Sequence, residues 1–162
     1  MNRLIIALDR KNGIAKHGYT PWYIPDDLIY FSKLTKTDGG IVLVGRTTYD
    51  VAFKGQPLKD RANYVLTSRN DDLKGAYQVS NLQNWLEQHT DQDVWIVGGA
   101  NVYQQVMQSG KADELYVTKI DADFGCDQFF PDFEETHTLV EESEELEQNG
   151  FHFHYARYAK KS

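Results

Sequence analysis

The chain has 162 residues, of which 41% are hydrophobic, 13% aromatic and 25% charged. This length suits one domain of common size, and the composition is typical of a globular protein with a substantial core, which excludes a largely disordered chain. A net charge of −7 opposes tight binding to a polyanion, so nucleic acid is not an expected partner.

The sequence gives little support for a membrane-spanning segment, a disulfide bond or a metal site. The longest apolar run, Leu4 to Leu8, is far shorter than the roughly 20 residues that span a bilayer, and Asp9 ends it before it could act as a signal-peptide core. The single Cys126 cannot form an internal disulfide, and the five histidines show no metal-ligand spacing. We therefore expect a cytoplasmic protein with no membrane contact and no bound metal.

The first half of the chain alternates predicted strands with helical segments. Leu4 to Leu8 is typical of a strand. Pro25 to Thr35 predicts a helix, because proline stands at a suitable first position, two acids lie in the first turn, and apolar side chains repeat on one face. Ile41 to Val44 predicts a second strand, which Gly45 leads into a helical turn, and Tyr64 to Thr67 predicts a third.

The second half continues this alternation. Ser80 and Gln83 fit a capping box at the start of a helix. Residues 94–97 predict a strand, and Ala100 to Ser109 predicts a helix that stops at a glycine. Leu115 to Ile120 predicts a further strand.

The C-terminal region reads as antiparallel structure. The acid-rich stretch from Glu134 to Glu147 is typical of a solvated edge and loop, whereas Phe151, Phe153 and Tyr155 alternate with other residues as on a strand of an antiparallel hairpin. Several earlier apolar runs do not alternate, as expected of parallel strands covered on both faces. These patterns predict an α/β fold with a single mixed, mostly parallel central sheet of about eight strands and helices on both faces.

Asp27 is the most informative position in the chain. The helical period places it on the same face as Leu28, Phe31 and Leu34, so its carboxylate should point inward, while Asp26 fits the ordinary role of a helix-dipole partner. A carboxylate held against apolar neighbours is costly unless it is paired, and desolvation should raise its pKa. Its natural partner is a planar ligand with two adjacent N–H donors, such as the edge of a pterin or a guanine. A merely paired structural acid is the alternative.

The loop before this helix is stiff and aromatic. Tyr19 to Pro25 contains two prolines and Trp22, so it cannot form regular secondary structure. Trp22 on its own is more often a core residue than a ligand contact. Here it leads directly to the helix that carries Asp27.

Two strand-to-helix junctions suit an anionic group. In the first, Gly45 is followed by Arg46, Thr47 and Thr48, and a glycine, free backbone N–H groups and a guanidinium together favour phosphate. In the second, two adjacent glycines in Val97 to Tyr103 permit close approach of a pyrophosphate or a ring face, although they do not form the GxGxxG fingerprint. The alternative for the first segment is an exposed arginine beside ordinary helix caps, and for the second it is a structural turn.

A third strand end carries similar groups. Leu66, Thr67, Ser68 and Arg69 present hydroxyls and a guanidinium of the kind found in phosphate sites. Arg61 lies just before that strand, where a solvated loop charge is equally consistent with the sequence.

Taken together, these segments resemble the dihydrofolate reductase family from Leu4 to the final strand. The matching pieces occur in the family's order: Ala7 to Ala15 with Ile14, Pro21-Trp22, Pro25 to Leu28, Gly45-Arg46, Arg61, Thr67-Ser68, Gly98-Gly99 with Tyr103, and Tyr116 to Asp121 containing Thr118. Each piece alone is weak, but the ordered set is specific. The resemblance implies a single domain over residues 1–162, with residues 39–90 forming an adenosine-binding subdomain.

The resemblance also implies an activity. It is the reduction of 7,8-dihydrofolate to tetrahydrofolate for one-carbon metabolism, with NADPH giving a hydride to pterin C6 and with N5 gaining a proton. Asp27 would bind N3 and the 2-amino group, Thr118 would support it through a hydrogen bond, and Trp22 would hold water beside the ring. Arg61 would bind the α-carboxylate of the folate glutamate. Dihydrofolate and antifolate small molecules are the expected ligands, and a monomer is the expected state.

The remaining site residues follow from the same resemblance. The residues implied for substrate binding are Ile5, Ile6, Leu28, Phe31, Leu58, Arg61, Val97 and Tyr103. Those implied for NADPH binding are Ala7, Ile14, Gly45, Arg46, Thr47, Thr48, Leu66, Thr67, Ser68, Arg69, Gly98, Gly99, Ala100, Asn101 and Val102. Arg46 would contact the 2′-phosphate, and Arg69 is added on the basis of its charge.

Two other functions fit parts of this pattern. One is the NADPH-dependent reductase of riboflavin biosynthesis, for which the segment from Trp22 to Asp27 and Arg61 would have no purpose. The other is a non-catalytic nucleotide-binding module, in which Asp27 would be only a paired acid.

Overall fold

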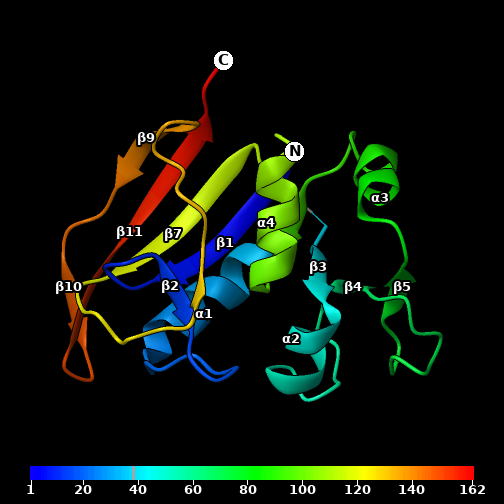
Figure 1. Cartoon of the computed structure of the whole chain (residues 1–162), viewed down its shortest axis with the longest axis horizontal. Coiled ribbons are helices and arrows are strands. Elements are labelled where there is room, and N and C mark those ends of the chain that lie inside the picture. The colour runs from blue at the N-terminus through cyan, green and yellow to red at the C-terminus, as the bar shows by residue number, and fades with distance from the viewer. Residues whose placement is uncertain (38) are drawn as a thin grey trace.

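The computed structural model describes residues 1–37 and 39–162 and has a mixed sheet at its centre (Figure 1). Within these residues the sheet has nine strands, in the order β10-β11-β7-β1-β6-β3-β4-β5, with β9 also paired to β11. The strand bounds are β1 Asn2–Leu8, β3 Ile41–Gly45, β4 Ala62–Leu66, β5 Tyr77–Val79, β6 Val94–Ile96, β7 Glu114–Ile120, β9 His137–Glu142, β10 Leu146–Gln148 and β11 Phe151–Lys160. A separate small sheet pairs β2 (Gly13–Ala15) with β8 (Gln128–Phe129).

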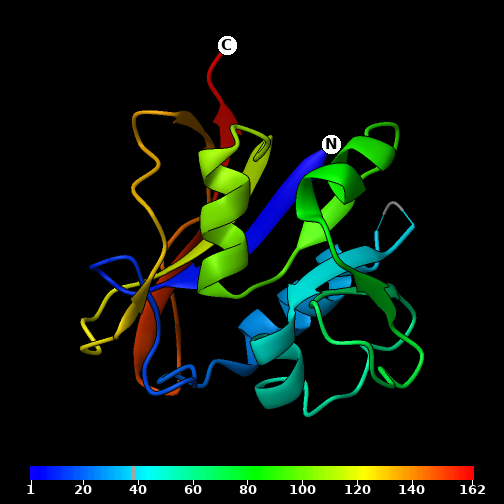
Figure 2. The same ribbon diagram turned by 45° about the vertical axis from the view of Figure 1, so that its right-hand side comes forward.

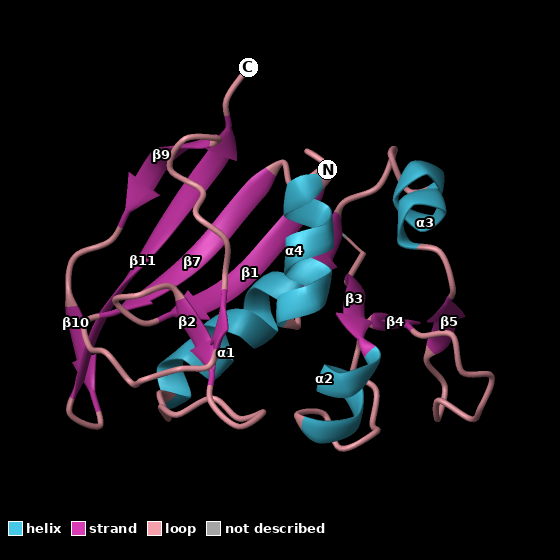
Figure 3. Ribbon diagram, viewed as in Figure 1, coloured by secondary structure: helices cyan, strands magenta, loops and turns pink. Residues whose placement is uncertain are grey.

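Helices cover both faces of the sheet, as predicted (Figure 3). They are α1 Pro25–Thr35, α2 Arg46–Val51, α3 Leu82–Gln88 and α4 Ala100–Gln108. The helices α1 and α2 pack on a core layer that contains Val42 and Trp95, whereas α3 and α4 pack on a layer that contains Leu43 and Ile96. Figure 2 separates the two pairs of helices, with α3 and α4 above α1 and α2 in that view. The central strands are therefore buried on both sides, which explains their unbroken apolar runs.

The parallel part of the sheet decides where a site can form. β1 pairs in parallel with β6 and β7, and β3 pairs in parallel with β6 and β4. The carboxyl ends of these strands therefore share one edge of the sheet, which is where ligands bind in α/β folds. This topology brings Ala7, Gly45, Leu66 and Val97 to the same edge although they are far apart in sequence.

The C-terminal strands confirm the predicted antiparallel hairpin. β10 and β11 are joined by Asn149 and Gly150, whose φ angles are 53° and 79°. Positive φ at both central residues is the geometry of a two-residue type I′ turn, for which Asn-Gly is the preferred pair. The acid-rich stretch before the hairpin supplies the exposed edge strand β9.

Several sequence predictions need correction in detail. The capping box at Ser80 and Gln83 is wrong, because α3 begins at Leu82 and Asn81 is its N-cap, with a side chain that accepts a hydrogen bond from the Asn84 N–H at 3.0 Å. The short strands β2, β5 and β8 were not predicted, since two or three residues carry too little periodicity. Among the described residues, no helix is long and apolar enough to cross a membrane.

Candidate active site

A cleft of about 790 Å³ opens at the carboxyl edge of the parallel strands. It brings together most of the residues that the sequence predicted for substrate and cofactor. The predicted residues that line it are Ile5, Ile6, Ala7, Ile14, Trp22, Asp27, Leu28, Phe31, Gly45, Arg46, Thr47, Thr48, Leu66, Val97, Gly98, Gly99, Ala100, Asn101, Val102, Tyr103 and Thr118. Their convergence from separate strand ends and helix starts makes this cleft the candidate active site.

Asp27 supplies a carboxylate to the cleft wall. It lies in the first turn of α1, and its Oδ1 accepts a hydrogen bond from Thr118 Oγ1 on β7 at 2.6 Å. Burial raises the pKa of Asp27 above its usual value, and the hydrogen bond from Thr118 opposes part of that rise. A cationic ligand, or one rich in N–H donors, would therefore stabilise the ionised form of this carboxylate.

The surroundings of this carboxylate are aromatic. The rings of Tyr30 and Tyr155 stack with centroids 4.0 Å apart, and Trp22 is buried in the cluster that also contains Ile24 and Phe153. Burial, helped by the nearby Asp27, raises the pKa of Tyr155 to about 12, so its hydroxyl stays neutral at physiological pH. These uncharged rings help to desolvate Asp27, but they supply no positive charge to pair with its carboxylate.

The apolar face of α1 is less buried than its periodicity predicts. Leu28 is 57% exposed, while Phe31 and Leu34 are half-buried against the core layer of Val42. Leu28 and Phe31 line the cleft, which explains why an apolar helix face remains partly open. Exposed apolar surface of this kind favours a flat hydrophobic ligand.

The two glycine-containing junctions press against each other. The Gly45 N–H donates to the Gly98 carbonyl at 2.8 Å, and the Gly98–Gly99 peptide bond is cis. A Cβ atom on Gly99 would lie 2.5 Å from Thr48 Oγ1, and one on Gly45 would lie 2.9 Å from Val102 Cγ2. Only glycine fits at either position without a shift of its neighbour. The sequence identified both glycine motifs but did not predict this contact between them.

The start of α4 offers free backbone donors to the cleft. Gly99 is the N-cap, and Ala100, Asn101 and Val102 in the first turn all line the cleft. The N–H groups of a first helical turn have no partner within the helix, so they suit an anionic group. Tyr103, one turn along, donates from its hydroxyl to the Ile5 carbonyl at 2.6 Å and ties α4 to β1.

Arg46 begins α2 and lines the cleft, and it is already paired within the chain. It donates from Nη1 and Nη2 to the two oxygens of Asp71 at 2.7 and 2.9 Å, and from Nε to Asp50. Arg69 does not line the cleft, but its Nη2 donates to the same Asp50 at 2.8 Å. The two guanidiniums are thus neighbours through a shared carboxylate, a link that the sequence did not predict.

The other predicted residues lie outside the lining of the main cleft. Thr67 and Ser68 line an adjoining hollow of about 390 Å³, and Leu66 lines both this hollow and the main cleft. Arg61 donates from Nη1 to Thr35 Oγ1 at 2.8 Å, so it stands beside the last residue of α1. Leu58 packs partly against the core layer below α1.

Several cleft residues were not singled out as site residues from the sequence. They are Ala15, Gly18, Tyr19, Thr20, Val51, Ala52 and Gln128. Val51 and Ala52 follow Thr47 and Thr48 by about one helical turn, a spacing that could have indicated them. Gln128 reaches the cleft through the pairing of β8 with β2, for which the sequence carries no signal.

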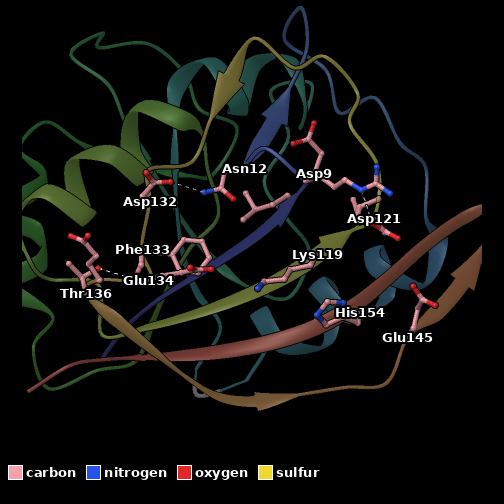
Figure 4. Close-up of a pocket in the computed structure, with 14 residues that line it drawn as sticks. Asp9, Asn12, Lys119, Asp121, Asp132, Phe133, Glu134, Thr136, Glu145 and His154 are labelled. Atoms are coloured by element: carbon pink, nitrogen blue, oxygen red, sulfur yellow. Dashed lines mark hydrogen bonds and ion pairs between the residues drawn. The ribbon is translucent and has the colours of Figure 1, made fainter.

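A second hollow of about 800 Å³ lies beyond the ends of β1 and β7 (Figure 4). Asp9 there accepts hydrogen bonds from the backbone N–H groups of Lys11, Gly13 and Phe124, and these lower its pKa despite burial. None of the predicted site residues lines this hollow. Across residues 1–37 and 39–162, no group of three acidic, histidine or cysteine side chains is placed to hold a metal ion.

Comparison with known proteins identifies the family to which this chain belongs. The family described as dihydrofolate reductase matches residues 1–160. A dihydrofolate reductase from Drosophila melanogaster is 37% identical and one from Bacillus subtilis (strain 168) is 34% identical, with 98% and 100% of this chain and 97% and 96% of the relatives covered.

A solved structure is also similar. It is a dihydrofolate reductase from Enterococcus faecalis complexed with NADP(H) and RAB-propyl, which matches with a TM-score of 0.87 and 27% identity over 100% of this chain and 97% of that one. The match in fold therefore extends over the whole chain, as the sequence match does. The chain belongs to the dihydrofolate reductase family.

Proposed function

We propose that this chain reduces 7,8-dihydrofolate to 5,6,7,8-tetrahydrofolate with NADPH, and that Asp27 is the residue on which the reaction depends. Family membership supports the reaction. The main structural support for the proposed site is that the desolvated carboxylate of Asp27 lies in one cleft with Gly45 and the Gly98-Gly99 turn. Substrate and cofactor would meet in this cleft, where the chain supplies orientation and excludes water.

Asp27 binds the pterin edge in this proposal. Its two oxygens accept from pterin N3 and from the 2-amino group, while Thr118 fixes the carboxylate from β7. A negative charge at this edge favours the positive charge that develops when N5 is protonated. Asp27 lies on the N3 side, so a water held near Trp22 would deliver the proton.

The length of α1 suits the rest of the substrate. Thr35 follows Asp27 by eight positions, so the helix places them about 12 Å apart along its axis at 1.5 Å per residue. Leu28 and Phe31 lie between them and would line the pterin and aminobenzoyl groups. Arg61, held beside Thr35, would bind the α-carboxylate of the glutamate. Ile5, Ile6, Leu58, Val97 and Tyr103 complete the proposed substrate site.

The other half of the cleft fits NADPH. When bound, the cofactor supplies the hydride that reaches pterin C6. The first turn of α4 offers N–H donors to a pyrophosphate, the glycines allow close approach, and Arg46 with Arg69 offers guanidiniums to the 2′-phosphate. The other proposed contacts are those of Ala7, Ile14, Thr47, Thr48, Leu66, Thr67 and Ser68.

Three further features belong to this proposal. Residues 39–90 carry β3 to β5 with α2 and α3 and would form an adenosine-binding subdomain within a single domain of residues 1–162. A cytoplasmic location is a further part of the proposal. The complete cleft within one chain suits a monomer, with dihydrofolate and antifolates as ligands.

A spectrophotometric assay tests the proposal. NADPH oxidation should depend on added dihydrofolate, should be stopped by a methotrexate-like antifolate, and should be slower with NADH. Oxidation with a ribosylamino-pyrimidine instead would favour the riboflavin-type reductase. Cofactor binding without turnover of either substrate would favour a non-catalytic nucleotide-binding module.

A further inference from the structure

Three ion pairs link four charged side chains in an open series at the cofactor end of the cleft. Arg46, Asp50, Arg69 and Asp71 make up this cluster, which we call the Arg46 cluster. Asp50 accepts from Arg46 Nε at 2.9 and 3.0 Å and from Arg69 Nη2 at 2.8 Å. Both guanidiniums that could receive an anion are therefore paired within the chain.

The contact between Arg46 and Asp71 has the geometry of an anion complex. The two carboxylate oxygens face Nη1 and Nη2 at 2.7 and 2.9 Å, which is the two-pronged arrangement that a guanidinium also offers to a phosphate. Asp71 thus occupies the terminal nitrogens of Arg46, and Asp50 occupies Nε. The Arg46 side chain is 15% exposed, so few other directions are open to an incoming anion.

Asp71 is held at this place by the segment that follows it. Leu73 is buried in the core layer of Val42, and its carbonyl accepts a hydrogen bond from the Tyr49 hydroxyl. Tyr49 belongs to α2, the helix that also carries Arg46 and Asp50. One helix therefore presents the guanidinium and anchors the loop that covers it.

We propose that Asp71 is a specificity-determining residue, an internal competitor that must leave Arg46 before the 2′-phosphate of NADPH can bind there. The inference rests on the proposed function of this cleft. A cofactor without the 2′-phosphate leaves the pair between Arg46 and Asp71 intact, so NADH loses nothing through it. Asp71 therefore reduces the preference of the protein for NADPH over NADH.

The charges of the cluster support this competition. Hydrogen bonds from Arg46 lower the pKa of Asp71, so its carboxylate stays ionised throughout the neutral range. An ionised carboxylate and a phosphate repel each other when they share one guanidinium. The 2′-phosphate and Asp71 are consequently alternatives at the terminal nitrogens of Arg46.

The test compares Asp71→Asn with Asp72→Asn. Both variants remove one negative charge from the same exposed loop, but the ion pair of Asp72 is with Lys74 at 3.7 Å and lies outside the cluster. Dissociation constants for NADPH and NADH are measured by fluorescence titration of the whole protein. We expect Asp71→Asn to bind NADPH about fivefold more tightly and NADH within about twofold of the wild type, with Asp72→Asn changing neither by more than about twofold.

Salt provides a second measurement. Because exposed pairs are screened, the gain of Asp71→Asn for NADPH should shrink when the ionic strength rises from about 0.05 to 0.5 M. Weaker binding of NADPH by Asp71→Asn would show that Asp71 only positions Arg46, and an equal change for both cofactors would show a general charge effect; either result overturns the proposal. Failure of the wild type to oxidise NADPH with dihydrofolate would instead refute the proposed function.

Discussion

At the Asp27 end of the cleft, a carboxylate lies beside the stacked rings of Tyr30 and Tyr155 and accepts a hydrogen bond from Thr118. At the Arg46 end, guanidiniums and carboxylates pair with one another near the surface. Desolvation raises the pKa of Asp27, whereas ion pairing raises that of Arg46. A desolvated charge interacts strongly with the ligand group that it meets, while an exposed pair exchanges one partner for another at modest gain. The first end therefore suits chemistry and the second suits recognition.

The largest effect is expected at the Asp27 end. Asp27→Asn should lower kcat/KM for dihydrofolate at least about a hundredfold at pH 7, because the charge that favours N5 protonation is lost. The loss should narrow at low pH, where the wild-type carboxylate is also protonated. Steady-state rates across pH measure this, with Asp26→Asn as the control, since Asp26 is exposed on the same helical turn. Unchanged activity at pH 7 would remove Asp27 from the mechanism.

A smaller effect is expected at the Arg46 end. Arg46→Leu should raise KM for NADPH about tenfold to thirtyfold, as expected from the loss of charge-assisted hydrogen bonds, and should change KM for NADH far less. Arg69→Leu should act in the same direction with a smaller change, because Arg69 lies outside the cleft lining. Parallel KM values for the two cofactors provide the measurement. Equal increases for NADPH and NADH would contradict a role at the 2′-phosphate.

Thr118→Val sharpens the contrast by keeping the shape of a buried side chain while removing its hydroxyl. Thr118 is 2% exposed, and its hydrogen bond lowers the pKa of Asp27. The variant should therefore raise KM for dihydrofolate about tenfold, the value of one charge-assisted hydrogen bond, and should move the acid limb of the pH profile upward. Thr118→Ser should restore both properties. An unshifted pH profile would argue for a packing role only.

The smallest effect concerns stability. Because the folded pKa of Asp27 is raised above 3.8, the folded protein binds more protons than the unfolded chain at pH values just above 3.8, so the ionised carboxylate destabilises the fold at neutral pH. Asp27→Asn should consequently unfold at a slightly higher temperature than the wild type at pH 7 and lose that advantage below about pH 4. Calorimetric melting curves at both pH values measure this. A lower melting temperature at pH 7 would contradict the desolvation of Asp27.

The parallel strands of the core were predicted well because burial on both faces gives them a clear sequence pattern. Unbroken runs such as Ile41 to Val44 are buried on both faces, and the helix of Pro25 to Thr35 has its proline and acids in place, so both elements were predicted within a residue. The predicted N-cap of α3 was wrong because serine and asparagine are both favourable N-cap residues. The backbone conformation at Ser80 and Asn81, which the sequence alone does not reveal, decides which of them caps the helix.

The site was less predictable where it depends on contacts between distant segments. The place of Asp27 in the cleft lining could be predicted from its helical face, because local periodicity decides that face. The pairing of Asp71 with Arg46 and the approach of Gly99 to Thr48 arise from the order of β3, β4 and β6 in the sheet. No local pattern in the sequence contains that information.

A ¹³C NMR titration of the Asp27 side-chain carboxyl shows whether burial raises its pKa in the folded protein. Loss of a signal in Asp27→Asn assigns the resonance, and the titration is repeated in Thr118→Val. We predict a midpoint above 3.8 in the ligand-free protein and a higher one in Thr118→Val. A midpoint at or below 3.8, insensitive to Thr118, would contradict a desolvated carboxylate at this end of the cleft.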